Sequence, residues 1–420
     1  NQMSKISIFL FLSVFTVSLN AQNIKSEDLT YSFVKLPSKP VMPKVENYLS
    51  TITSAYEAEN NKLTAQFEAD KARAEADYQR EMADYPVRVK AADDKYAKEM
   101  EAWNEKSTAS KILEKQLLNE NNRPVKDYVA NPYRRTITPP VLKTSYDYPA
   151  LASTYLRIDG YKKADMNALS YLVTLQGFEH SQPTIKSEVK KEVSRVNNVS
   201  TETSVTYYYV EYTYRHPMSV RVANANNQEI IYLAPMELTT YKTYKSTASK
   251  VAPSSDFSGL LRLSEEAILK ENLTFINHLV NDQIGYEVTP RTTSLDYVKS
   301  KNDAHADVME AYNNQMTGLK SLTVNETLAT QKLTAAIDAY TKILLESDLL
   351  DKKARIDKDV TVSIYFNMLE AYFAMRKTTE AEAIMATLSQ LDLSNKEKKF
   401  KEKYAEAFLD LTNRKAVNGL

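Results

Sequence analysis

The sequence predicts an α+β protein of several domains: a long N-terminal helical hairpin or kinked coiled coil, an antiparallel β domain with a covering helix, and a C-terminal α-helical domain. Three observations predict this order. Residues 45–118 are rich in Ala, Glu, Lys and Gln and contain no glycine, a composition typical of long helices. β-forming residues concentrate between residues 154 and 244, and amphipathic helical patterns return after residue 291.

Composition argues for folded domains and against several classes of function. With 420 residues, 43% of them hydrophobic, the chain can bury two or three cores. Lys+Arg and Asp+Glu both total 54, so no net charge attracts nucleic acid, and we expect no such partner. Only six glycines make a nucleotide loop unexpected. The absence of cysteine excludes disulfides, thiolate metal sites and a cysteine nucleophile, and we expect no cofactor.

The N-terminus predicts a secretory signal peptide. Lys5 provides the positive charge, residues 6–19 are apolar, and Asn20-Ala21-Gln22 forms a polar exit with a small residue. The apolar stretch is shorter than the roughly 20 residues of a transmembrane helix. We therefore expect an exported mature chain without an integral transmembrane segment. The Ser-Leu-Asn-Ala-Gln ending, the Tyr/Asn/Lys-rich composition and the lack of cysteine resemble exported proteins of Bacteroidota-type bacteria.

Proline placement and periodicity set the predicted divisions. Prolines 37, 40 and 43 predict an extended strap that is a stiff spacer rather than part of a folded core. Five prolines between residues 124 and 149 predict a linker or a segment draped over a neighbour. The predicted divisions are 1–22 signal peptide, 23–44 extended Pro-rich strap, 45–120 helical arm, 121–150 Pro-rich linker, 151–290 antiparallel β domain with helix, and 291–420 α-helical domain.

The predicted arm has one apolar stripe between charged faces. Steps of three and four residues define it, as in a coiled-coil or hairpin seam. Its members are Leu49, Ile52, Tyr56, Leu63, Phe67, Ala74, Tyr78, Met82, Tyr85, Val89, Ala92, Tyr96, Met100 and Trp103. Pro86 removes one helical hydrogen bond, so we favour two packed helices that turn at 84–86, with a continuous kinked rod as the alternative.

The β domain contains a tyrosine-rich strand, VTYYYVEYTY at 205–214, preceded by a polar segment at 185–202 that predicts a long exposed hairpin or loop. The predicted covering helix over 264–281 begins at the cap Ser264 and buries Leu269, Leu273, Ile276 and Val280. Tyrosines 207, 208, 209, 212 and 214 suit either cross-strand packing or an aromatic platform for a sugar or an extended peptide. Tyr207 and Tyr209 are the candidate binding residues of this strand.

The C-terminal helices have a spacing that resembles one tetratricopeptide unit. The pattern is Tyr365-x-x-Met368-Leu369-x-x-Tyr372 followed by Thr378-x-x-Ala381-x-x-x-Met385-x-x-Leu388, with Arg376 at the position of the glycine-like turn. Ala336-x-x-x-Tyr340-x-x-Ile343 is similar to the second helix of a preceding unit, and 396–413 to a solvating cap. The resemblance implies a peptide- or protein-binding scaffold, with Tyr365, Tyr372 and Met385 as candidate partner-binding residues.

Catalytic signatures are missing from the sequence. Histidines 180, 216, 278 and 305 have no partner motif, and no GxSxG is present. Asp303, His305 and Asp307 have ligand chemistry, but on the helix we expect there, His305 points away from both carboxylates. We predict no catalytic residue and no metal site.

These observations predict a non-enzymatic periplasmic scaffold or adaptor for protein–protein interaction, free or peripherally associated with the outer membrane as an accessory subunit of an outer-membrane complex. The helical C-terminal segment, without a β-rich sorting domain, favours the periplasm over the cell surface. The alternative from another class is a glycan-binding module that uses the strand tyrosines. A hydrolase with an unrecognised active site is the third hypothesis, and a deep pocket with convergent polar groups would favour it.

Overall fold

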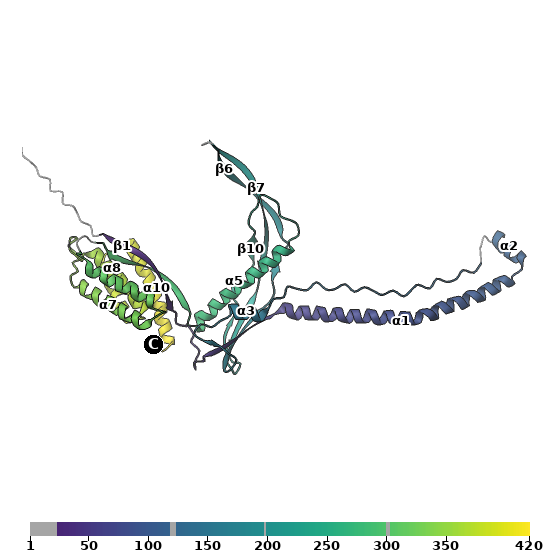
Figure 1. Cartoon of the computed structure of the whole chain (residues 1–420), viewed down its shortest axis with the longest axis horizontal. Coiled ribbons are helices and arrows are strands. Elements are labelled where there is room, and N and C mark those ends of the chain that lie inside the picture. The colour runs from purple at the N-terminus through teal and green to yellow at the C-terminus, as the bar shows by residue number, and fades with distance from the viewer. Residues whose placement is uncertain (1–22, 118–122, 197–198, 300–302) are drawn as a thin grey trace, which may run out of the picture.

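The computed structural model describes residues 23–117, 123–196, 199–299 and 303–420, which form a helical domain, a sheet domain and a long arm (Figure 1). The predicted signal peptide at 1–22 lies outside the described residues. Within the described ranges, no helix combines the length and the apolar character needed to cross a membrane. The prediction of an α+β protein with a long N-terminal helix and C-terminal helices is confirmed.

The helical domain packs the C-terminal helices on a two-stranded antiparallel sheet. The helices are α6 (Ala306–Ser321), α7 (Glu326–Leu344), α8 (Lys358–Ala374), α9 (Thr378–Gln390) and α10 (Asn395–Val417), and the strands are β1 (Ile24–Val34) and β11 (Val288–Val298). One core joins them, with Leu29 and Tyr31 from β1, Leu295 from β11, Leu333 from α7 and Leu369 from α8. The domain is therefore built from both ends of the described chain.

The prediction of a spacer over 23–44 is wrong. Its first part is strand β1, and Leu36 and Val41 further along are also buried. The reason lies in the alternation of Leu29, Tyr31 and Phe33 with polar residues, a two-residue period that places these side chains on one face of a strand. The prolines begin only after this strand has ended, so they do not prevent its pairing with β11.

A buried polar cluster joins both strands to two helices. The fully buried carboxylate of Glu370 on α8 accepts hydrogen bonds from Arg291 Nε (2.7 Å) and Nη2 (3.0 Å) on β11. Tyr404 of α10 donates to the same carboxylate at 2.7 Å, and Tyr31 of β1 also donates to it. Burial, and next the charge of Glu370, raise the pKa of both tyrosines well above the usual value. Each ionic or polar group in the cluster has a partner, as burial of charge requires.

The sheet domain has a mixed five-stranded sheet rather than the purely antiparallel one predicted. The strand order is β3 (Lys162–Lys163), β2 (Asn47–Ser54), β4 (Ala168–Leu175), β8 (Met218–Ala223) and β9 (Glu229–Leu233). Strand β2 pairs in parallel with both β3 and β4. Parallel neighbours require a long connection, and here the whole arm together with α3 (Tyr148–Tyr155) lies between β2 and β4 in the chain.

Helix α5 (Ser258–Ile284) covers this sheet, with α3 beside it. The predicted inner face is confirmed, because Leu269, Leu273, Ile276 and Val280 are all fully buried. The predicted N-cap is wrong: Ser264 lies inside the helix, where its hydroxyl donates to backbone carbonyls of the preceding turn. The sequence pattern located the buried face correctly and placed the start of the helix too late.

A second sheet is built around β7 (Val199–Arg215). It pairs with β10 (Lys242–Lys245), β5 (Glu179–His180) and β6 (Thr184–Val196), and the one-turn helix α4 (Met236–Thr239) precedes β10. The register of β6 and β7 places Thr184 opposite Glu211 and continues without a shift to Val196 opposite Val199. Figure 1 shows the hairpin standing away from the body, as expected for the polar segment at 185–202.

The arm consists of α1 (Ala55–Glu105), α2 (Thr108–Leu117) and an extended segment at 123–147 that runs back alongside α1 (Figure 1). The favoured prediction of two packed helices with a turn at 84–86 is wrong, since α1 continues through Pro86. A proline without a backbone N–H costs the helix one hydrogen bond and some strain, and the surrounding helix-forming residues tolerate it. Of the alternative, a continuous kinked rod, the continuity is confirmed, since α1 is one unbroken helix.

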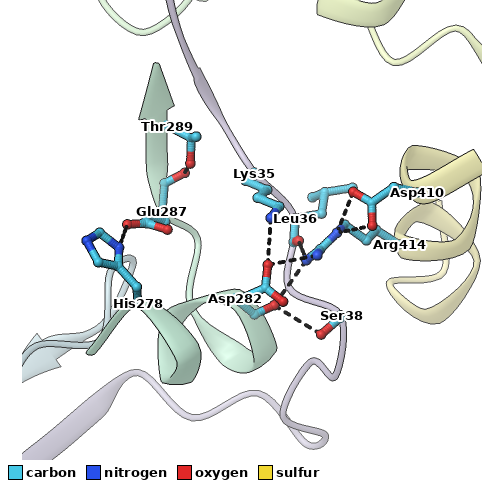
Figure 2. A network of polar contacts seen from close by, with 9 residues as sticks. All are labelled: Lys35, Leu36, Ser38, His278, Asp282, Glu287, Thr289, Asp410 and Arg414. Atoms are coloured by element: carbon cyan, nitrogen blue, oxygen red, sulfur yellow. Dashed lines mark hydrogen bonds and ion pairs between the residues drawn. The ribbon is translucent and has the colours of Figure 1, made fainter. Parts of the chain in front are cut away.

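A polar junction holds the helical domain against the sheet domain (Figure 2). Arg414 of α10 is buried, and its guanidinium donates to the Leu36 carbonyl oxygen (2.7 Å), the Asp282 carbonyl oxygen (3.0 Å) and Asp282 Oδ1 (2.8 Å). Lys35 binds the same carboxylate at 2.6 Å. Burial alone would raise the pKa of Asp282, but Lys35 and Arg414 lower it below the usual value. The end of α5, the segment after β1 and the end of α10 therefore meet at one charged point.

Candidate functional site

The arm is the candidate interaction site, and the extended segment 123–147, which we call the arm strap, is the part that the sequence left undefined. Contacts between it and α1 run in antiparallel order along the helix. They join Asn60 with the Lys143 backbone (2.9 and 2.8 Å), Glu75 with Arg134 (3.0 Å), Tyr85 with Asn131 (2.7 Å), Asp93 with Lys126, and Lys95 with Asp127 (2.8 Å). The open prediction of a linker or a draped segment resolves to the draped segment.

The spacing of these contacts identifies the conformation of the arm strap. From the Asn60–Lys143 contact to the Asp93–Lys126 contact, the helix covers residues 60–93 and the strap covers residues 126–143. At about 1.5 Å per residue for a helix and about 3.1 Å for polyproline II, both paths measure about 50 Å. The strap is therefore fully extended against the helix, which suits its proline content because an extended chain with few backbone donors needs few partners.

The two sides of the arm strap differ in exposure. Its half-buried residues are Pro124, Val129, Pro132, Ile137, Pro140, Thr144 and Tyr146. Ile137 lines a hollow together with Phe67 and Ala74 of α1, whereas at the base of the arm Tyr146 packs against the core of the sheet domain and Thr144 lies against Glu265 of α5. Val125, Tyr128, Tyr133 and Val141 are strongly exposed, with exposed fractions of 83%, 86%, 74% and 92%, and Tyr133 also lines a hollow beside Asp77 and Tyr78 of α1. A row of apolar and aromatic side chains is thus presented to solvent along the arm.

The predicted helical stripe is wrong at its start, because Leu49 and Ile52 lie in strand β2; from Tyr56 onward it lies on α1, on the face that the arm strap covers. Most of its members are half-buried: Tyr56, Leu63, Phe67, Ala74, Tyr78, Tyr85, Val89, Tyr96, Met100 and Trp103. Ala92 is the buried residue of the helix, while Met82 remains exposed. An extended strand is narrower than a second helix, so it shields this stripe without enclosing it.

Charged residues secure the arm strap at its middle. Arg134 pairs with Glu75 and its guanidinium lies over the ring of Tyr78, 5.1 Å from the centroid. At the base of the arm, the Tyr56 hydroxyl donates to the Phe178 carbonyl oxygen and accepts from its N–H, both at 2.7 Å. These contacts fix the arm to the sheet domain at one end and the strap to the helix along its length.

The structure divides the strand tyrosines between two faces of β7. Tyr212 faces α5, where its hydroxyl contacts Ser264 and its ring stacks on Tyr244 at 4.8 Å. Tyr207 and Tyr209 lie on the other face, where lysines cover their rings: Lys190 and Lys250 over Tyr207, and Lys245 over Tyr209 at 3.9 Å. At least one face of each ring is therefore covered by a lysine of the domain itself.

The candidate residues of the C-terminal helices pack inside the helical domain. Tyr372 is buried, and Tyr365 and Met385 are half-buried against the same core. Arg376, at the position expected for a glycine-like turn, has a positive φ of 57° between α8 and α9. The turn at Arg376 has the backbone conformation that glycine favours, and the three side chains named for partner binding pack against the domain core, with Tyr365 and Met385 partly exposed.

The candidate ligands Asp307 and His305 make contacts within the fold. Residues before 306 form a turn rather than the expected helix, and Asp303 has a φ of 52°. Asp307 binds the Arg355 guanidinium at 2.8 Å, and the buried His305 contacts the Arg355 carbonyl oxygen at 2.8 Å. Across the described residues, no group of three or more His, Asp or Glu side chains has the arrangement of a metal site.

Comparison with protein-family models, with curated proteins and with solved structures gave no match for this chain. The assignment of a site therefore rests on geometry. The sequence identified the stripe on α1 by its period, but it missed the exposed row on the arm strap, because an extended segment has no helical or strand period that separates inner from outer residues.

Proposed function

We propose that the protein is an exported, non-enzymatic scaffold of the periplasm whose arm engages a protein partner. One observation supports this most strongly. An arm about 75 Å long, from the rise of its 51-residue helix, presents a row of apolar and aromatic residues, 74% to 92% exposed, along its strap. Such side chains are typical anchors of protein interfaces, where aromatic residues contribute most.

The construction of the arm favours interaction over chemistry. Its surface is a helix and an extended strap with charged pairs, and burial along α1 is confined to one position. A catalytic site needs converging polar groups in a closed cleft, whereas a protein interface needs exposed area on a preorganised surface. The arm provides the second of these. Attachment to an outer-membrane complex would let the arm bridge that complex and a soluble component.

The test is a shortened arm. Replacing residues 79–133 with a short Gly-Ser loop removes the distal arm and keeps the pairs Asn60–Lys143 and Glu75–Arg134 at its base. Tagged parent and variant are extracted gently from the native host, and the co-purifying proteins are quantified by mass spectrometry. We expect a stoichiometric partner with the parent, in the periplasmic or membrane fraction, and its loss from the variant.

The control is the unfolding of the body. Circular dichroism melting of the variant should retain the transitions of the helical and sheet domains, because their cores contain no residue from 79–133. Equal recovery of the same partner by both proteins would contradict a role for the arm. If the parent protein is recovered with no co-purifying protein in either fraction, the proposed scaffold function is contradicted.

A matched pair of point variants narrows the contact. Tyr128→Ser changes an exposed residue of the arm strap and Val129→Ser its half-buried neighbour. Partner recovery should fall with Tyr128→Ser while the arm keeps its resistance to trypsin. Val129→Ser should instead increase trypsin cleavage of the strap, so the two effects separate binding from folding.

A further inference from the structure

A cavity of about 670 Å³ lies beside the domain junction, on the side of the helical domain. Its walls include Phe33 and Leu36 from the segment around the end of β1, Phe373 and Arg376 from the end of α8, and Leu411 from α10. This volume lies within the range of small-ligand pockets, about 300–1,000 Å³. The cavity is far from the arm in the fold and belongs to a different domain (Figure 1).

One side of the cavity is apolar. The rings of Phe33 and Phe373 meet edge to face at 5.4 Å, and Phe373, Leu36 and Leu411 are themselves buried. Leu322, at the end of α6, adds a further aliphatic side chain. A hydrocarbon or an aromatic group placed against this wall would bury apolar surface on both partners.

Arg376 is one of the cations that line the cavity, together with Lys35, Lys377 and Arg414, and Lys35 is bound to Asp282. Its Nη2 donates to the Val34 carbonyl oxygen at 2.9 Å. Arg414, the other arginine of the cavity, is bound to Asp282 and Asp410. Arg376 forms no ion pair with any carboxylate in the part of the chain that the structure describes, although burial lowers its pKa and the charge of Glu326 on the rim opposes that shift.

The backbone conformation at Arg376 is one that glycine normally adopts. Its φ of 57° lies in the left-handed region, where glycine is free of the steric penalty that a side chain incurs. This turn closes α8, with the Lys377 N–H bonded to the Tyr372 carbonyl oxygen, a position at which helices commonly use glycine. An arginine here costs stability that its single hydrogen bond offsets only in part.

We propose that this cavity binds an apolar carboxylate, with the carboxylate on the guanidinium of Arg376 and the hydrocarbon against Phe33 and Phe373. The planar guanidinium can donate two parallel hydrogen bonds to a carboxylate, which a lysine cannot do. Glu326 sets the limit on affinity, because it competes for the same cation. The site is independent of the proposed function of the arm, so either can fail alone.

Two sources supply this chemistry: a free fatty acid and the C-terminal end of a peptide with an apolar last residue. Calorimetric titration of the full chain uses decanoate with decanol as the neutral control, and a short peptide ending in Leu-Phe with its amidated form as control. We expect at least one carboxylate to bind about tenfold or more tightly than its neutral control, from the charged hydrogen bonds. Which of the two binds identifies the source.

Substitutions at two positions should shift affinity in opposite directions. Arg376→Gly removes the cation and suits the left-handed backbone, so the chain should fold and bind the carboxylate about tenfold or more weakly. Glu326→Gln removes the competing charge and should tighten binding a few-fold. Lys398→Ala is the control, since this lysine of the same domain is exposed and does not line the cavity, and it should change affinity little.

Three results would overturn the proposal. These are equal affinity for the carboxylates and their neutral controls, unchanged affinity in Arg376→Gly, and no binding of either carboxylate. A melting curve for Arg376→Gly that matches the parent ensures that a loss of binding reports the side chain. These outcomes do not depend on whether the shortened arm loses its partner.

Discussion

The helical domain and the arm are both largely helical, but different interactions stabilise their helices. In α8, twelve of seventeen residues are buried, whereas α1 has one buried residue, Ala92, in 51. Helix α8 contains Val, Ile, Phe and Tyr, which are modest helix formers, and its conformation depends on packing. Helix α1 is rich in Ala, Glu and Lys, so its conformation depends on intrinsic propensity and on pairs such as Asp70–Arg73 and Asp77–Arg80.

The helical domain therefore contributes most to the stability of the fold, whereas the arm contributes mainly exposed surface. Substitutions in the helical domain should change the free energy of global unfolding, because each removes buried contacts. Substitutions in the arm should change only local opening, because few contacts connect the arm to either core. The predictions below test this contrast, from the largest expected effect to the smallest.

Removal of the buried carboxylate should have the largest effect. Glu370→Ala leaves the guanidinium of Arg291 partly buried without its ion-pair partner and removes the acceptor of two tyrosine hydroxyls. We expect a loss of about 3–5 kcal/mol in the unfolding free energy of the helical domain, measured by urea denaturation with the fluorescence of that domain's tyrosines. Glu75→Ala on α1, which breaks the exposed pair with Arg134, is the matched control and should cost about 1 kcal/mol or less. Similar losses from the two substitutions would contradict the contrast between the regions.

A buried histidine predicts a pH dependence in the sheet domain. His216, between β7 and β8, is buried with its ring edge-on to Phe178, and burial lowers its pKa to about 4. The unfolded chain, with a pKa near 6.5, binds this proton first as the pH falls, so the contribution is present above about pH 6.5 and is lost between pH 6.5 and 4. The difference amounts to up to about 3 kcal/mol.

The test compares the unfolding free energies of the parent and His216→Leu from pH 4 to pH 7. The leucine has a similar volume and no titratable group, so the variant should lose less stability over this interval. Carboxylates titrate equally in both proteins and cancel in the difference. Parallel curves for the two proteins would show that His216 is protonated in the folded state at the same pH as in the unfolded chain.

Local periodicity explains which parts of the fold could be predicted. The inner face of α5, the stripe on α1 and the exposed β6–β7 hairpin follow from residues close together in the chain, and the structure agrees with each. The pairing of β1 with β11 could not be predicted, because the register joins Ile24 to Val298 and no local signal specifies so distant a partner. The alternation of Leu29, Tyr31 and Phe33 is typical of a strand, whereas the prolines that predict a spacer belong to the segment after it.

The two sites differ in the same respect. The arm could be predicted as an exposed helical element from composition alone, while the exposure of its strap residues required the contacts with α1. The cavity could not be predicted, because Phe33, Leu322, Arg376 and Leu411 come from four segments that only the folded domain brings together. A single signal was present in the sequence, an arginine at a turn position that favours glycine.

Pro86 offers a test of how locally the arm is stabilised. Pro86→Ala restores the N–H that hydrogen-bonds to the Met82 carbonyl oxygen and removes the steric strain of the ring. We expect the helix around this position to become more resistant to opening by about 1–3 kcal/mol, seen as slower amide hydrogen exchange over residues 80–92. The melting temperature of the body should not change, since Pro86 belongs to neither core. A rise in the global melting temperature would show that the arm unfolds together with the domains.

The smallest effect should distinguish the two sides of the arm strap. Ile137→Ser changes a half-buried residue that faces α1, and Val141→Ser a residue that is 92% exposed. Loss of half of an isoleucine contact should weaken the strap by about 1 kcal/mol, or roughly fivefold in its opening equilibrium. Limited digestion with trypsin measures this opening, because Arg134 and Arg135 lie in the strap, and cleavage there should be faster in Ile137→Ser and unchanged in Val141→Ser. Equal acceleration by both substitutions would mean that the strap rotates freely on the helix, and then the exposed row would no longer be a preorganised surface for a partner.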